Sequence, residues 1–158
     1  MKAKATITFV ALLFAALAVR AGDVGGPPQP DEVLGFWKMV PIDKPELNKV
    51  NPWPLPYQWF AFYPDGHFVS MAKTENVEYN RKQLEAIFEV MKADSPRYSW
   101  RQNFLLIEYP DVPGKFEMWG VNIFRKDVRF ARAGDLMMTL AGGEDGAPVY
   151  YRHLEPVK

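Results

Sequence analysis

Strand-like runs in this 158-residue chain are separated mostly by connections of about two to six residues. Connections this short join antiparallel neighbours, because a parallel pair needs a long crossover. The predicted strands are Gly35–Val40, Tyr57–Tyr63, His67–Ala72, Tyr98–Gln102, Phe104–Tyr109, Phe116–Phe124, Val128–Arg132, Leu136–Ala141 and Val149–Leu154. Such spacing is typical of a sandwich or a barrel, and we expect an antiparallel up-and-down β-barrel of about eight or nine strands.

One segment, about residues 78–93, interrupts this pattern with helical periodicity. Its apolar residues recur at i, i+3, i+4 and i+7, and they are Leu84, Ile87, Phe88 and Met91. Asn76 can cap the start of this helix, and Asp94-Ser95-Pro96 ends it. The sequence therefore predicts one α-helix inserted between the third and fourth strands.

The N-terminal residues 1–21 have the pattern of a secretory signal peptide. Lys2 and Lys4 precede the apolar run Ile7–Val19, and Ala21 offers a small residue for cleavage before Gly22. An uncleaved anchor is the alternative, but the run is shorter than the roughly 20 residues that span a bilayer. We expect a periplasmic or secreted protein with no membrane span after cleavage. Residues 22–32 read as a flexible Gly/Pro-rich leader and residues 33–158 as one domain.

The charge balance disfavours nucleic acid as a partner. The whole chain has 19 basic and 19 acidic residues, and loss of Lys2, Lys4 and Arg20 with the signal peptide leaves 16 against 19, a net charge of −3. A mildly acidic chain without basic runs binds polyanions poorly.

Few residues are suited to metal binding or catalysis. The chain has no cysteine and two histidines, so we expect no metal centre. It contains no nucleophile elbow, phosphate loop or zinc-protease motif, and we expect no catalytic residue and no enzyme. Glu108 and Glu117 flank one hairpin and could approach each other as an acid–base pair, or both could simply be solvated.

Three short motifs occur in order along the chain. Gly35-Phe36-Trp37-Lys38 starts the first strand, Phe62-Tyr63-Pro64-Asp65-Gly66-His67-Phe68 forms a tight hairpin, and Gly134-Asp135-Leu136-Met137-Met138-Thr139-Leu140 is followed by Tyr150-Tyr151-Arg152. Together they resemble the lipocalin-like (calycin) barrels found in bacterial exported proteins. The resemblance covers most of residues 33–155.

This resemblance implies a structural role for Gly35, Trp37 and Arg152 at the closed end of the barrel. An arginine near the end of such chains packs over the tryptophan of the first strand, and a cation–π contact of this kind is worth about 0.5–2 kcal/mol. The resemblance also implies that the long loop after the first strand, Pro41–Pro56, lies over the open mouth. Trp53 could close the mouth from above, or the loop could pack against the wall.

The candidate ligand-binding residues are the aromatic, methionine and histidine side chains that could point into the barrel. They are Trp53, Phe60, Phe62, Trp100, Met118, Phe130, Met138, Tyr151 and His153. The opposite-parity neighbours Trp59 and Tyr63 are alternatives to Phe60 and Phe62, and a barrel of this size can also be filled by its own side chains. His153 shares a face with Tyr151 and could ligate haem, or it could be a hydrogen-bonded histidine at the rim.

These observations support two expectations of function. The first is a protein that binds a small apolar or amphipathic molecule inside the barrel, with no cofactor. The second is an interaction or inhibitor module with a filled core, which binds an envelope protein through the Pro41–Pro56 loop or the helix.

Overall fold

The computed structural model describes residues 24–42, 45–48, 50–51, 53, 55–142 and 147–158. The predicted signal peptide therefore lies outside the described residues, as do parts of the Pro41–Pro56 loop and of the turn before the last strand. No helix in the described ranges combines the length and hydropathy needed to cross a bilayer.

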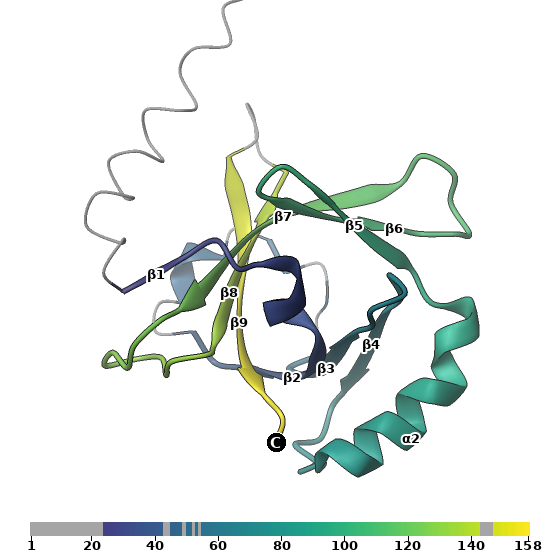
Figure 1. Cartoon of the computed structure of the whole chain (residues 1–158), viewed down its shortest axis with the longest axis horizontal. Coiled ribbons are helices and arrows are strands. Elements are labelled where there is room, and N and C mark those ends of the chain that lie inside the picture. The colour runs from purple at the N-terminus through teal and green to yellow at the C-terminus, as the bar shows by residue number, and fades with distance from the viewer. Residues whose placement is uncertain (1–23, 43–44, 49, 52, 54, 143–146) are drawn as a thin grey trace, which may run out of the picture.

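The described chain is mainly β, with nine antiparallel strands in one curled sheet (Figure 1). The strands are β1 (Gly25–Gly26), β2 (Gly35–Val40), β3 (Tyr57–Phe62), β4 (Phe68–Lys73), β5 (Arg97–Arg101), β6 (Phe104–Glu108), β7 (Phe116–Phe124), β8 (Leu136–Ala141) and β9 (Pro148–Pro156). One α-helix, α2 (Arg81–Met91), and the short 3-10 helices η1 (Pro30–Val33), η2 (Pro45–Leu47) and η3 (Lys92–Asp94) complete it. The predicted mainly β, up-and-down architecture with one inserted helix is confirmed.

Strands consecutive in sequence pair throughout the order β4-β3-β2-β9-β8-β7-β6-β5, with the single exception of the pair between β2 and β9. The last strand therefore lies between β2 and β8, and its pairing with β2 joins the two halves of the chain. The ends of this order, β4 and β5, are splayed apart along most of their length (Figure 1). In the described residues they meet at one bridge, where Phe68 donates to the Pro96 carbonyl and Tyr98 to the Gly66 carbonyl.

Two hydrophobic clusters lie on opposite faces of the sheet. The inner cluster gathers Trp37, Phe60, Phe62, Trp119 and Leu154 among others, at the concave side of the curl. In the outer cluster, Leu84 and Phe88 of α2 pack against the outward residues of β2, β3 and β4. The alternation of β3, with Phe60 and Phe62 inward and Trp59 and Ala61 outward, serves both clusters.

Three local predictions were wrong. The helix begins at Arg81 rather than near residue 78, and Asn80, not Asn76, caps it by accepting from the Gln83 amide. Residues 128–132 form a turn with a single bridge between Val128 and Ala131 instead of a strand. The segment predicted to be a flexible leader contributes β1, which pairs with β7, and η1, whose Val33 is in the core.

Candidate functional site

The Trp37 end of the barrel is closed by η1. The Trp37 indole N–H donates to the Val33 carbonyl at 2.8 Å, and both side chains are buried. Gly35 adopts a φ of +119°, which favours glycine. The bridge between β4 and β5 lies at this end as well, because Phe68 pairs with Phe62, opposite Gly35. This end is therefore filled by backbone and apolar side chains.

Arg152 does not cover Trp37, so that prediction was wrong. Pairing between β2 and β9 sets Trp37 opposite Pro156, which places Arg152 several residues away toward the other end of the sheet. Its guanidinium lies over the rings of Trp53 at 3.8 Å, Trp119 at 4.6 Å, Phe60 at 4.7 Å and Tyr150 at 5.8 Å. Arg152 is therefore a residue of the interior, at the end that η1 leaves open.

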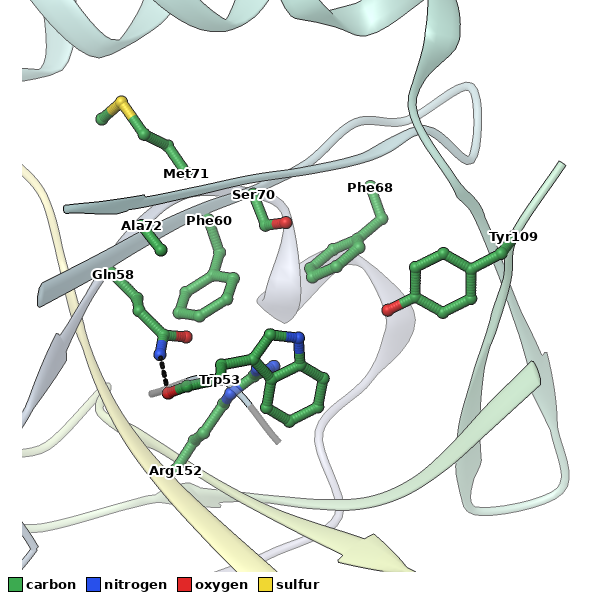
Figure 2. Close-up of a pocket in the computed structure, with 9 residues that line it drawn as sticks. All are labelled: Trp53, Gln58, Phe60, Phe68, Ser70, Met71, Ala72, Tyr109 and Arg152. Atoms are coloured by element: carbon green, nitrogen blue, oxygen red, sulfur yellow. Dashed lines mark hydrogen bonds between the residues drawn. The ribbon is translucent and has the colours of Figure 1, made fainter. Parts of the chain in front are cut away.

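A small cavity of about 30 Å³ lies beside this guanidinium (Figure 2). It is lined by Trp53, Gln58, Phe60, Phe68, Ser70, Met71, Ala72, Tyr109 and Arg152. Ser70 and Ala72 have the inward parity of Phe68, yet both are exposed, because β4 has no paired strand on this side. The cavity therefore reaches the solvent along β4.

Trp53 lines the cavity and packs against two other aromatic rings. Its ring stacks on Trp119 at 5.8 Å between centroids and approaches Tyr150 at 5.7 Å. The buried Gln58 side chain holds this part of the loop by donating to the carbonyls of Trp53 and Leu55, at 3.3 and 3.0 Å. The indole is only partly buried, so one side of it contacts solvent while the other lines the cavity.

Burial lowers the pKa of Arg152 to about 10, so the guanidinium stays charged at neutral pH. The side chain is 3% exposed, and its Nε has no hydrogen-bond partner. Within the described residues, no carboxylate oxygen lies within 4.0 Å of its nitrogens.

Glu117 is the acid that faces this interior. Its carboxylate accepts from the Tyr109 hydroxyl at 2.6 Å and from the Trp119 indole N–H at 3.0 Å. Burial, and then the bond to Glu117, raise the pKa of Tyr109. Glu108 pairs with Phe116 and points outward, so the acid–base pair with Glu117 is not formed.

The predicted ligand residues divide into three groups. Trp53 and Phe60 line the cavity. Phe62 and Met138 are buried in the inner cluster and do not line the cavity, and Trp100 packs against the edge of the same cluster. Met118, Tyr151 and His153 have the wrong parity and face outward, and Phe130 is 49% exposed over Phe124. Gln58, Ser70 and Tyr109 also line the cavity, although they were not among the predicted residues. Arg152 was predicted at the opposite end of the barrel.

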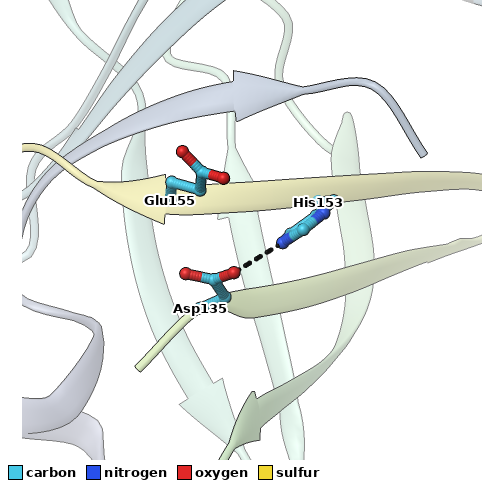
Figure 3. A group of neighbouring side chains, drawn as sticks. All are labelled: Asp135, His153 and Glu155. Carbon is cyan, nitrogen blue, oxygen red and sulfur yellow. Dashed lines mark hydrogen bonds and ion pairs between the residues drawn. The ribbon is translucent and has the colours of Figure 1, made fainter. Parts of the chain in front are cut away.

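His153 is buried on the outer face, where its Nε2 lies 2.9 Å from Asp135 Oδ2 (Figure 3). Together with the exposed Glu155, these side chains place three possible metal-ligating atoms within 4.8 Å of one another. The same Asp135 oxygen also accepts from the Arg132 amide at 2.7 Å and so fixes the turn before β8. His153 therefore has a structural partner, and it does not face the interior, as a haem ligand inside the barrel would.

Comparison with protein-family models, with curated proteins and with solved structures found no match.

Proposed function

We propose that this protein binds a small apolar or amphipathic molecule in the interior of its sheet, at the cavity between Trp53, Phe60 and Arg152. The observation that carries the proposal is a cavity walled by aromatic rings that reaches the solvent beside the edge strand β4. Apolar pockets with a few convergent polar groups are the usual form of small-molecule sites. Among the described residues, the interior offers binding contacts and no activated nucleophile, so we propose binding rather than catalysis.

The volume of the cavity sets a condition on this proposal. About 30 Å³ holds little more than a water molecule, whereas sites for organic ligands measure several hundred Å³. The Trp53 indole occupies the adjoining space. A ligand must therefore displace this ring, and its place against Trp119 and Arg152 becomes part of the binding site.

A neutral fluorescent probe, N-phenyl-1-naphthylamine, tests this proposal. Trp53→Ala should enlarge the site and strengthen binding of the probe, because the probe no longer has to displace the indole ring. The expected gain is roughly tenfold in affinity, or about 1.4 kcal/mol in free energy of binding. Val50→Ala, in the same loop but 47% exposed, is the matched control and should bind like the wild type. Absence of probe binding by both the wild type and Trp53→Ala, with no small molecule in native mass spectra, would refute the proposal.

We further propose that the chain is an exported, lipocalin-like protein. The motif order and the predicted signal peptide support this placement. Cell fractionation should find the protein in the periplasm or the medium, and mass spectrometry should give the mass of a mature chain that begins at Gly22. A full-length mass in the cytoplasmic fraction would contradict it.

A protein partner is the second candidate function, and one surface favours it. The hairpin between β6 and β7 exposes Val112 and Phe116, at 48% and 59%, beside a groove of about 350 Å³ that Arg97 and Lys115 also line. Exposed apolar side chains with a charged rim are typical of interaction sites. A stoichiometric envelope protein that co-purifies with the wild type and is lost in Phe116→Ser would favour this function.

A further inference from the structure

The chemical class of the ligand can be inferred from the charge of the interior, and this inference rests on the proposed function. Arg152 places a permanent cation among the rings of Trp53, Phe60 and Trp119. Taking a guanidinium out of water is costly unless it is paired and hydrogen-bonded. Aromatic faces offset part of that cost.

Glu117, the acid that faces the interior, does not form an ion pair with Arg152. Both Glu117 oxygens accept hydrogen bonds, one from Tyr109 and the other from Trp119, and Glu117 lies more than 4.0 Å from the guanidinium. Arg152 Nε is buried and has no acceptor. The arrangement keeps a positive charge at the cavity wall with donor capacity left over.

Around the cavity, the remaining polar groups are few and mostly neutral. Gln58, Ser70 and Tyr109 line it together with the phenyl rings of Phe60 and Phe68 (Figure 2). An anionic oxygen beside Arg152 would meet one cation, and the attached chain would meet rings. A group with two charges would have only that one cation to offset them, and Glu117 would repel it about twice as strongly as a group with one charge.

We infer that the ligand is a monoanionic amphiphile, a carboxylate on an apolar chain, whose head binds Arg152 and whose chain replaces Trp53 along the aromatic wall. A charged hydrogen bond of this kind is expected to strengthen binding by roughly 10- to 150-fold. Ligands with the same chain length and different head groups should therefore differ clearly in affinity.

Matched competitors on the wild-type protein give the first test. Decanoate, decanol and decyl phosphate, each below its micellar concentration, are titrated against bound N-phenyl-1-naphthylamine at neutral pH. Decanoate should displace the probe at a concentration at least about tenfold below that of decanol. Equal displacement by decanol, or tighter binding of decyl phosphate, would overturn the inference while leaving the proposed function intact. Failure of the probe to bind both the wild type and Trp53→Ala, with no small molecule in native mass spectra, would instead refute the proposed function, and the inference with it.

Variants of Arg152 give the second test. Arg152→Met removes the charge and keeps an unbranched side chain, so the preference for decanoate over decanol should vanish while probe binding persists. Arg152→Lys should retain part of the preference, and Arg129→Met, which removes an exposed guanidinium, should retain all of it. A preference unchanged in folded Arg152→Met would overturn the inference. If Arg152→Met does not fold, the wild-type competition still decides.

Discussion

At the scale of single residues, Glu32 shows how one side chain fastens the N-terminal segment to the sheet. Its carboxylate forms an ion pair with Arg125, with Oε2 at 2.9 Å from Nη2, and also accepts from the Gln29 amide. The hydrogen bond from Arg125, followed by that from Gln29, lowers the pKa of Glu32 to about 2. The pair links η1, which closes the Trp37 end, to the end of β7.

A carboxyl group with a lowered pKa stabilises the fold above its ordinary pKa, near 4.5, and this stability is lost as the pH falls toward 2. Glu32→Gln should therefore be less stable than the wild type at pH 7, and the two urea midpoints should converge between about pH 5 and pH 2. Arg125→Gln removes the same pair from the other side and should follow the Glu32→Gln curve. Midpoints that stay equally far apart at pH 2 would contradict this role.

Which side chains of a strand face the interior could not be predicted where both faces of the strand are apolar. On β3 the sequence left Phe60 and Phe62, or their neighbours Trp59 and Tyr63, as alternatives, and the structure places Phe60 and Phe62 in the interior. On β9 both faces carry aromatic residues, and the inward set contains Arg152, a residue that hydropathy assigns to solvent. The predicted alternation of β9 was therefore off by one residue, which placed Tyr151 and His153 in the interior instead of on the outer face. The contacts that hold Arg152 inside come from Trp53 and Trp119, which no local pattern reveals.

At the scale of elements, α2 was predictable as a helix because its apolar stripe is periodic. Its start was also readable, since Asn80 has a glutamine three residues later and forms a capping box with Gln83, whereas Asn76 has Tyr79 at that position. The turn at residues 128–132 could not be predicted from local sequence, which favours a strand there. Asp127 shapes it by accepting from the Ala133 amide and Arg132, and these contacts override the β propensity of Val128 and Phe130.

Packing of α2 on the outer face gives a prediction for this element. Leu84 is fully buried against the outward side of β2–β4, so Leu84→Ala should lower the free energy of unfolding by about 2–5 kcal/mol. Val90, on the same helix, is 84% exposed, and Val90→Ala should change it by less than about 0.5 kcal/mol. Urea denaturation of both variants measures the difference. Equal effects would mean that the helix is not anchored through Leu84.

At the scale of the whole molecule, the two ends of the sheet meet through Gly66. Its φ is +85°, and a Cβ added there would lie 3.3 Å from the Tyr98 carbonyl oxygen. Gly66→Ala should therefore destabilise the fold by about 1–2 kcal/mol. It should also speed hydrogen exchange of the Phe68 and Tyr98 amides, which form the bridge.

Gly26→Ala is the control for this prediction, because an added Cβ there meets no atom within 4 Å and the residue has no positive φ. Its stability should stay near that of the wild type. Unchanged exchange at Phe68 and Tyr98 in Gly66→Ala would show that the bridge does not depend on the turn.

The position of β9 has a consequence for how this chain folds. The most C-terminal of the described strands, β9, lies in the middle of the sheet order, and Trp37 pairs with Pro156 across nearly the whole domain. Contacts between residues so distant in sequence form slowly, because the loop between them must close first. A nascent chain that lacks β9 has two separate half-sheets, and their inner faces stay exposed until the strand with Arg152 arrives. The two half-sheets are therefore expected to join only after β9, which carries the interior cation Arg152, has been synthesised.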